Sequence, residues 1–463
     1  MNSHRLPSLS LGPTLIFLGL GVVACLMPVH NDTWWHLRSG YETLRTWRPL
    51  LFDHFSYTAY GADFFNHSWL AQAVFYSVFS VGGLPLLTAL CAALTVIAWL
   101  LVWRMLRGDS DIRTIVFVLA LAASTTIWSV RPQVFSILLL PVVAGLAARD
   151  RLWPIPPLVA IWANLHGGVA IAAVVMAASV TVAAIRDRER LFARALCLAA
   201  TVGATLLTPL GAVYWTETVA SMARSRANQI QEWQATPIAP ESLPFWALAG
   251  CLIWLLARDW RRLETPGDRV IAMAAVIVLP LAVRSLRNVP AFLMLATPTI
   301  TVLLDRRGEA PTPARAQAAG PRAPLSVALV VAGALVAGAT VWRAWSTPWP
   351  MLGWQPVSHA AAEAVAGCNG PLYNRYPDGG PLIWFVPSQR VFVDSRQDQY
   401  PIALVQAASR VETTGDYREI FDRWRINCAA LPPTSPTVAA LERDNWVVKF
   451  SDPAWVVLER PAR

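Results

Sequence analysis

The chain consists largely of long apolar segments that are separated by short polar ones. A helix of about 20 apolar residues spans the hydrocarbon core of a bilayer. Only 14% of the residues are charged, against about 25% in a soluble domain. The sequence therefore predicts an all-α polytopic membrane protein with about eleven transmembrane helices and the lipid bilayer as a partner. The expected spans lie at about 12–29, 84–103, 114–130, 134–148, 153–165, 168–185, 195–211, 243–257, 270–283, 288–304 and 324–343.

The arginines give the expected orientation. With the N-terminus in the cytoplasm, the inside segments carry 18 arginines and the outside loops before the last span carry eight. Short cytoplasmic loops are enriched in basic residues, so this placement is favoured, and an odd number of spans puts the C-terminal tail outside. The formal charge of +9 is explained by these loops, because no basic, aromatic-laced soluble face suited to nucleic acid is visible.

Two domains are expected. A transmembrane domain covers 1–343 and includes an external loop at 30–83, in which 68–82 is apolar but too short to span and is read as an interfacial helix. A small extracytoplasmic α/β domain covers 344–463, with strands at 391–396 and near the end, and a short helix at 438–444. Of the six cysteines, Cys368 and Cys428 lie in this polar tail. Outside the cytoplasm they would either pair in a disulfide or stay free.

The first external loop is rich in polar and aromatic residues. Asp32 and His36 are four residues apart and would share one face of a helix. The tryptophans here either anchor the membrane interface or contact a substrate. The candidate binding residues of this loop are His36, Arg38, Asp53, His67 and Trp69.

Similar residues recur at the external ends of later spans. Ionisable groups near a bilayer are costly and tend to mark functional sites, whereas the inside clusters are plain arginine runs. We therefore expect the external residues to converge with Asp32 on one pocket. They are Arg131, Gln133, Asn164, His166, Glu232, Arg284 and Arg287.

This set suits transfer from a lipid-linked phosphate. A carboxylate can take a proton from an acceptor, and arginines can hold a phosphate through paired donors. Asp32, His36, His67 and His166 could instead supply metal ligands, but their spacing matches no known metal signature. The sequence thus predicts no required cofactor and no metal site, with a divalent metal as the alternative.

The block Asp32-Thr33-Trp34-Trp35-His36-Leu37-Arg38-x-Gly40 resembles the bacterial GT-C-type polytopic membrane glycosyltransferase-like proteins. The similarity extends to D-x-F-S-Y-T at 53–58, H-x-W-L at 67–70, R-P-Q at 131–133 and N-x-H-G at 164–167, and to Y-P-D-G-G and V-D-S-R in the tail.

The resemblance implies a multi-helix fold in the inner (cytoplasmic) membrane. It also implies an inverting transfer from a polyprenyl-phosphate sugar with Asp32 as catalytic base. Many members carry two acids here, whereas this chain has Asn31 before Asp32. That departure counts against both a metal site and the transferase assignment.

The sequence is compatible with two functions. The first is a membrane glycosyltransferase that transfers a sugar from a polyprenyl-phosphate donor to an unidentified extracytoplasmic acceptor. The alternative is a non-catalytic membrane protein, either a transporter of lipid or solute or a scaffold. A transporter should carry ionisable groups near the bilayer midplane, so their depth discriminates the two.

Overall fold

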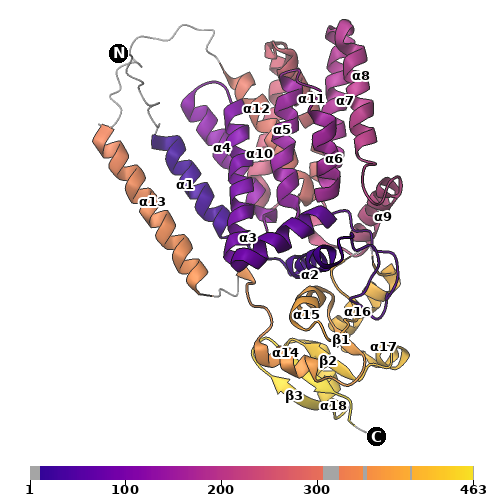
Figure 1. Ribbon diagram of the computed structural model, residues 1–463. Helices are drawn as coiled ribbons and strands as arrows, with labels where there is room; N and C mark the ends of the chain where they lie inside the picture. Colours follow the sequence, from indigo (N-terminus) through magenta and orange to yellow (C-terminus); the bar gives the residue numbers. More distant parts are fainter. Residues whose placement is uncertain (1–10, 306–322, 348–351, 397–398, 462–463) are drawn as a thin grey trace.

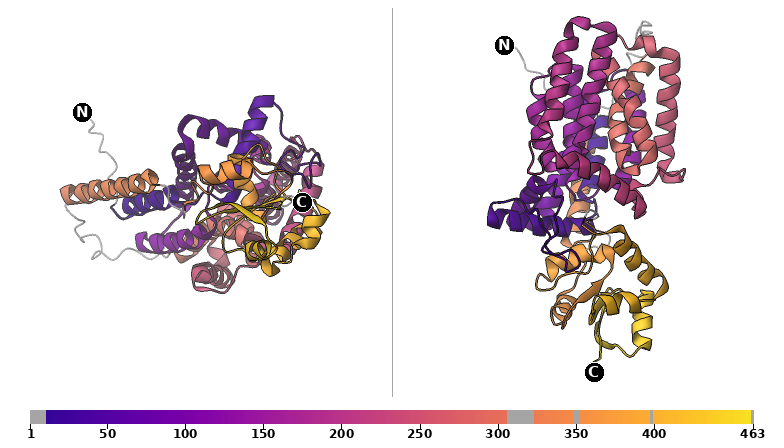
Figure 2. Two further views of the ribbon diagram at one scale, coloured as in Figure 1. Left: turned by 90° about the horizontal axis from the view of Figure 1, so that it is seen from below. Right: turned by 90° about the vertical axis from the view of Figure 1, so that its right-hand side faces the viewer.

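The computed structural model describes residues 11–305, 323–347, 352–396 and 399–461. A bundle of helices forms one part of the molecule, and a smaller domain that contains a sheet lies beyond one end of the bundle (Figures 1 and 2). Each of the eleven expected segments contains a helix. These are α1 (Leu11–Cys25), α3 (Trp69–Met105), α4 (Ser110–Ser124), α5 (Gln133–Ala148), α6 (Ile155–Leu165), α7 (Ala170–Arg186), α8 (Leu191–Ala204), α10 (Leu243–Asp259), α11 (Pro266–Arg284), α12 (Val289–Leu304) and α13 (Ala323–Ser346).

The chain is a multi-pass membrane protein. Seven helical segments of the described chain are long and apolar enough to cross a membrane. The sequence predicts about eleven spans, and fewer segments reach the required length because several helices are short. Helix α6 has 11 residues and at 1.5 Å per residue spans only about 16 Å. α1, α5 and α8, with 15, 16 and 14 residues, are also short.

A glycine pair separates the two parts of α3. Gly83 has a φ of 63°, in the left-handed region that side chains other than glycine rarely adopt. The expected helix at 68–82 forms the first part, which lies across the end of the bundle (Figure 1). The second part, after Gly83, enters the bundle.

The C-terminal domain has a four-stranded sheet in the order β1-β2-β4-β3. β1 (Leu372–Asn374) is parallel to β2 (Cys428–Leu431), whereas β4 (Val456–Glu459) is antiparallel to both β2 and β3 (Val447–Ser451). The domain also contains α14 (His359–Ala366), α15 (Gly379–Phe385), α16 (Ile402–Thr414), α17 (Arg418–Arg423) and α18 (Pro436–Arg443).

Two local expectations for this domain hold and one is wrong. The last strand is β4, and the short helix is α18. Residues 391–396 form no strand of the sheet. Their pairing is a single bridge between Val391 and Ser56, and the Asn374 side chain bonds the backbone at Phe392 and Val393. The segment is extended because it joins the domain to the first loop rather than to the sheet.

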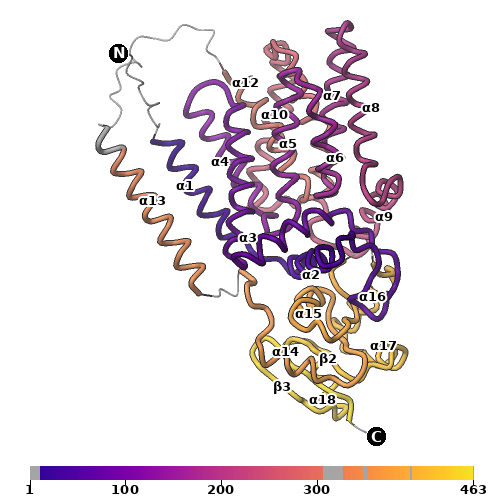
Figure 3. Tube along the Cα trace, viewed as in Figure 1, coloured from indigo at the N-terminus to yellow at the C-terminus, as the bar shows by residue number. Residues whose placement is uncertain are grey.

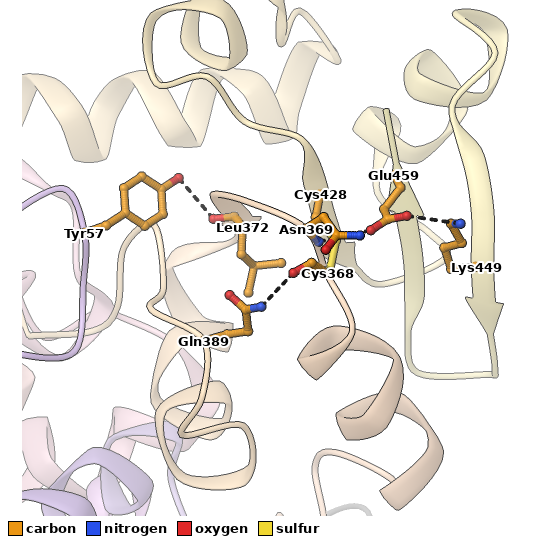
Figure 4. Close-up of a disulfide and its surroundings, with 8 residues drawn as sticks. All are labelled: Tyr57, Cys368, Asn369, Leu372, Gln389, Cys428, Lys449 and Glu459. Carbon is orange, nitrogen blue, oxygen red and sulfur yellow. Dashed lines mark hydrogen bonds and ion pairs between the residues drawn. A yellow bond between two sulfur atoms is a disulfide. The ribbon is translucent and has the colours of Figure 1, made fainter. Parts of the chain in front are cut away.

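A disulfide links Cys368, just after α14, to Cys428 at the start of β2 (Figure 4). Gln389 Nε2 donates to the Cys368 carbonyl at 2.9 Å, and Asn369 N donates to Glu459 at 3.1 Å. The bond therefore ties helix and sheet together inside the C-terminal domain, away from the bundle.

Helix α2 (Asn31–Thr46) lies between the bundle and the C-terminal domain. Its Trp34 is 2% exposed and packs against Trp384 and Phe385 of the α15 region at ring-centroid distances of 6.5 and 4.8 Å. The loop that follows α2 bends toward the C-terminal domain (Figure 3), where Thr58 Oγ1 donates to the Phe392 carbonyl at 2.5 Å. These contacts place the start of α2 at the junction of the two parts.

Candidate active site

Asp32 lies in the first turn of α2, where the exposed N–H groups of a helix favour a negative charge. Its Oδ2 is 3.1 Å from Arg131 Nη1 and 3.3 Å from His30 Nδ1. Its Oδ1 accepts from Trp35 Nε1 at 3.4 Å and from the hydroxyl of Ser395. The side chain is 16% exposed, so the carboxylate is well bonded but reachable from outside.

Arg131 joins Asp32 to a second carboxylate. It lies just before α5, and its Nε donates to Ser129 Oγ at 2.7 Å. One guanidinium nitrogen, Nη2, is 2.9 Å from Glu232 Oε2, and Nη1 is 3.2 Å from Glu232 Oε1. This paired geometry with Glu232 fixes the plane of the guanidinium.

Glu232 bridges two arginines. It lies in the 3-10 turn η4 (Gln231–Trp233), and its backbone carbonyl accepts from Ser285 Oγ at 3.0 Å. Besides Arg131 it binds Arg287, whose Nη1 is 3.2 Å from Glu232 Oε1. Arg287 also lies over the ring of Trp233 at 5.0 Å. Two carboxylates and two guanidinium groups thus form a chain of balanced charge, here called the open cluster: Asp32, Arg131, Glu232 and Arg287.

His166 extends the open cluster toward the bundle. Its Nε2 is 2.9 Å from Arg287 Nη2 and its Nδ1 is 2.7 Å from Ser136 Oγ. An arginine can only donate, and the backbone N–H of Gly168 donates to Nδ1 at 3.0 Å, so donors face both ring nitrogens. Ser136 accepts from Trp162 Nε1 at 2.7 Å. His166 is therefore held as a neutral acceptor that orients Arg287.

The pKa values agree with this charge pattern. Burial alone would raise the pKa of Asp32, but His30, Arg131 and the Ser395 hydroxyl together hold it well below its usual 3.8. Burial likewise opposes ionisation of Glu232, yet Arg287 and Arg131 lower its pKa from 4.5 to about 2. Burial lowers the pKa of His36 to about 3, and burial with Arg287 lowers that of His166 well below 6.5. At neutral pH both acids are charged and both histidines neutral.

The remaining predicted residues that lie near the cluster have hydrogen-bond or ring contacts of their own. His36 Nδ1 lies 3.2 Å from Gln72 Nε2. Trp69 Nε1 donates to Asn164 Oδ1 at 2.7 Å, joining the start of α3 to the end of α6. The rings of His67 and His166 are 6.2 Å apart. Gln133 Oε1 accepts from Arg131 Nη2 at 3.4 Å. Gln133 thus contacts the cluster directly, His67 lies beside His166, and Trp69 and Asn164 bond each other.

Three predicted binding residues lie elsewhere. Arg38 pairs with Glu42 at 2.8 Å on α2. Asp53 is fully buried against Arg396 at 2.7 Å. Arg284 is exposed, and no hydrogen bond or ion pair from it reaches the cluster within the described part of the chain. Arg284 is only three residues from Arg287, but the chain turns between α11 and α12, so sequence distance could not tell which arginine faces inward.

Sequence reasoning missed Ser395, Ser136 and Trp35 as contacts of the site. Ser395 lies in the V-D-S-R block of the tail, 363 residues from Asp32. No local pattern signals such a contact. For Ser136, helical spacing from the predicted Gln133 was the one available signal.

A cavity of about 70 Å³ adjoins the cluster inside the bundle. Arg287 and His166 form its polar end, and most of its other lining is apolar. The apolar lining comes from α5, α6, α7, α12 and the turn before α5: Ile127, Ile137, Leu140, Trp162, Ile171, Pro290, Ala291 and Met294. A charged end against apolar walls suits a ligand with an anionic head and a hydrocarbon tail.

Among the described residues, no group of three or more His, Cys, Asp or Glu side chains is placed to hold a metal ion. Asp32 and Glu232 are instead joined through Arg131.

No protein-family model and no curated protein matches the sequence. Solved structures do match in fold. The oligosaccharyltransferase AglB from Archaeoglobus fulgidus, in complex with an inhibitory peptide and a dolichol-phosphate, aligns over 91% of this chain and 69% of its own with a TM-score of 0.58 and 12% identity. ArnT from Cupriavidus metallidurans, bound to undecaprenyl phosphate, aligns over 97% of this chain and 98% of its own with a TM-score of 0.50 and 14% identity.

At these identities the likeness concerns the fold. Both matches cover the helix bundle and most of the tail, as the coverage of this chain requires. The chain therefore has the GT-C-like fold of a multi-pass membrane protein, with a small sheet-containing domain at one end.

Proposed function

We propose that this chain is a membrane glycosyltransferase that transfers a sugar from a polyprenyl-phosphate donor to an acceptor outside the cytoplasm. One observation carries the proposal. The open cluster holds an ionised carboxylate at one end and, at the other, an arginine that closes an apolar cavity. An anionic lipid head and a proton acceptor would thus meet in one continuous site.

The donor phosphate fits best at Arg287. Its side chain is 25% exposed, more than the 10% of Arg131. A guanidinium matches a phosphate through paired hydrogen bonds. The cavity beside it is small, so most of a polyprenyl tail would lie against the apolar helix surfaces and in the bilayer. Dolichol-phosphate and undecaprenyl phosphate in the two fold relatives are lipids of this class.

Asp32 is the proposed base. The acceptor hydroxyl would attack the sugar carbon that bears the phosphate. A new carbon–oxygen bond forms there as the bond to the phosphate oxygen breaks, and polyprenyl phosphate leaves. The hydroxyl proton passes to Asp32 as the attack proceeds. Arg131, bonded to Asp32 and linked through Glu232 to Arg287, compensates charge between base and leaving group.

The distribution of ionisable residues supports this over a transporter. A transporter places such groups near the bilayer midplane, often at broken helices. In the described helices of the bundle, charged residues lie only near the ends: α5, α6 and α12 contain none, and α7 has only Arg186 in its last turn. The arginine distribution further supports a cytoplasmic N-terminus with the C-terminal domain on the opposite side of the membrane. Insertion in the inner membrane is part of the proposal.

Two measurements test the proposal. Binding of undecaprenyl phosphate to the protein in nanodiscs should weaken at least tenfold in Arg287→Gln, because a charge-assisted phosphate contact is lost. Arg284→Gln is the matched control, since it removes the same charge three residues away and should bind as wild type.

Transfer from a panel of polyprenyl-phosphate sugars is the second measurement. Asp32→Asn should lower the rate by about 10²–10⁴-fold, the usual contribution of a general base, with undiminished membrane insertion. Equal lipid binding by both arginine variants, or full transfer by Asp32→Asn, would remove the corresponding role.

A further inference from the structure

Two segments of the C-terminal domain have no role so far: Y-P-D-G-G at 376–380 and V-D-S-R at 393–396. Both meet the membrane domain at the start of α2, beside Asp32. The first precedes α15 and enters its first turn, and the second follows the extended stretch that joins the first loop. Through these two segments the C-terminal domain reaches the candidate active site.

Beside Asp32, the C-terminal domain contacts the membrane domain through a hydrogen bond between a hydroxyl and a carboxylate. Ser395 Oγ bonds Asp32 Oδ1, and Trp35 Nε1 lies 3.2 Å from the same hydroxyl and 3.4 Å from the same carboxylate oxygen. An ionised carboxylate can only accept, so Ser395 donates to Asp32 and accepts from Trp35. With Arg131 on Oδ2, both oxygens are fixed from opposite parts of the molecule.

The Ser395 hydroxyl is itself held in place. The Tyr376 hydroxyl donates to the Ser395 carbonyl at 3.2 Å. The next residue, Arg396, is 1% exposed and pairs with Asp53 of the first loop and Asp394 at 2.7 and 2.6 Å. A residue between such anchors has little freedom, so its hydroxyl stays directed at Asp32.

The glycine pair makes this approach sterically feasible. A Cβ at Gly380 would lie 2.3 Å from the Asn31 carbonyl oxygen, and one at Gly379 would lie 2.3 Å from the Val393 carbonyl oxygen. Both distances are far below contact, so any larger residue would push α15 away from α2 or from the V-D-S-R segment. The two segments thus act together to bring Ser395 to Asp32.

We propose that Ser395 is a positioning residue for Asp32, and that the C-terminal domain completes the catalytic site of the membrane domain by supplying this hydroxyl. The inference rests on the proposed function, because it concerns the base of that reaction. Small displacements of a catalytic group lower rates strongly, by as much as about 10²-fold per ångström. Fixing the carboxylate from both sides is therefore a direct contribution to the rate.

Kinetics of Ser395→Ala and Ser395→Thr test the proposal. The alanine variant should lose about 10–100-fold in kcat and keep the wild-type affinity for undecaprenyl phosphate, since Arg287 is untouched. The threonine variant keeps the hydroxyl and should recover most of the rate. Ser388→Ala, which changes an exposed serine of the same domain, is the matched control and should behave as wild type.

The pH profile separates positioning from a merely structural role. The charged or titratable groups that face Asp32 are His30, His36, Arg131 and Glu232, and all remain in Ser395→Ala. Loss of the one hydroxyl that stabilises the carboxylate should raise the pKa of Asp32, so the acidic limb of kcat/KM moves upward by about one pH unit. A wild-type kcat and profile in Ser395→Ala, or equal loss in the alanine and threonine variants, would overturn the proposal.

Infrared difference spectroscopy distinguishes this failure from failure of the proposed function. The carboxylate band that disappears in Asp32→Asn identifies Asp32 without any substrate. If Ser395 bonds Asp32, that band shifts in Ser395→Ala and returns in Ser395→Thr. An unshifted band rejects the contact itself. A shifted band in a protein whose Asp32→Asn variant still transfers sugar rejects the base role of Asp32, and with it the positioning role, while it retains the contact.

Discussion

The molecule contains two clusters in which carboxylates pair with arginine, and they differ in burial. The open cluster joins Asp32, Arg131, Glu232 and Arg287, whose side chains are 10–25% exposed. The second, here called the closed cluster, consists of Asp53, Asp394, Arg396 and Tyr400. Its ion-paired side chains are 0–1% exposed, and Tyr400 donates to Asp394 at 2.6 Å.

Aromatic rings and hydrogen-bond donors enclose the closed cluster. The guanidinium of Arg396 lies 5.0 Å from the ring centroids of both Phe55 and Phe64, and Asp53 also accepts from Ser56. Both carboxylates there share the one guanidinium of Arg396, and all three side chains are almost fully buried. The open cluster instead borders a cavity and the outside. The closed cluster thus joins the first loop to the C-terminal domain, whereas the open cluster keeps the partial exposure that the proposed binding of a ligand requires.

The largest expected effect lies in the closed cluster. Asp53→Asn should destabilise the protein by about 3–5 kcal/mol, because the buried carboxylate accepts from Arg396, Ser56 and the backbone N–H of Phe55, and an amide nitrogen would leave two of these donors unsatisfied at about 1–3 kcal/mol each. Asp32→Asn should cost only about 1 kcal/mol, because its pair is partly solvated and Arg131 keeps Glu232. Thermal unfolding in detergent measures both. Equal losses would mean that burial does not separate the clusters.

The next effect concerns the disulfide. Replacing Cys368 and Cys428 by serine should lower the stability of the C-terminal domain by about 2–4 kcal/mol. The bond lies within that domain (Figure 4), so binding of undecaprenyl phosphate should stay unchanged. Weakened lipid binding at a temperature where the variant is folded would show that the domain controls the open cluster over a longer range than the Ser395 contact.

A smaller effect is expected at Glu232. Glu232→Gln removes one negative charge from a balanced cluster and frees Arg131 and Arg287 for an anion. Undecaprenyl phosphate should therefore bind about five- to tenfold more tightly, as expected for loss of a competing charge in a partly solvated site. Native mass spectrometry or calorimetry can measure the change. Weaker binding would show that Glu232 chiefly holds the arginines in place, as Asp394 and Asp53 hold Arg396.

At neutral pH the smallest effect is that of His36 on stability, and it grows as the solution is acidified. The pKa of His36 falls from 6.5 to about 3 on folding, so the unfolded chain takes up its proton first. Stability is then present above pH 6.5 and is lost as the pH falls from about 6.5 toward 3, by up to about 1.4 kcal/mol per pH unit for each such histidine. His36→Asn should flatten this slope between pH 6 and 4, as followed by melting temperature. An unchanged slope would mean that His36 is protonated in the folded protein.

Much of the architecture follows from the sequence. Apolar length predicts the helices, and the separate helix at 68–82 is recognisable because its apolar run is too short to span before the Gly82-Gly83 break. The candidate site residues could be gathered as a set because ionisable groups near a bilayer are costly and tend to mark functional sites. Within that set, however, Arg287 and Arg284 carry equal signals, and so do Asp32 and Asp53.

What the sequence determined by itself is the membrane fold, since the hydrophobic effect acts on each segment according to its own composition. Only the tertiary structure decided which charges stay partly solvated, which are sealed between phenylalanines, and that a serine near the end of the chain reaches Asp32. Those outcomes depend on packing between segments hundreds of residues apart. Burial, not residue type, sets the energy of a charge and its freedom to bind a ligand.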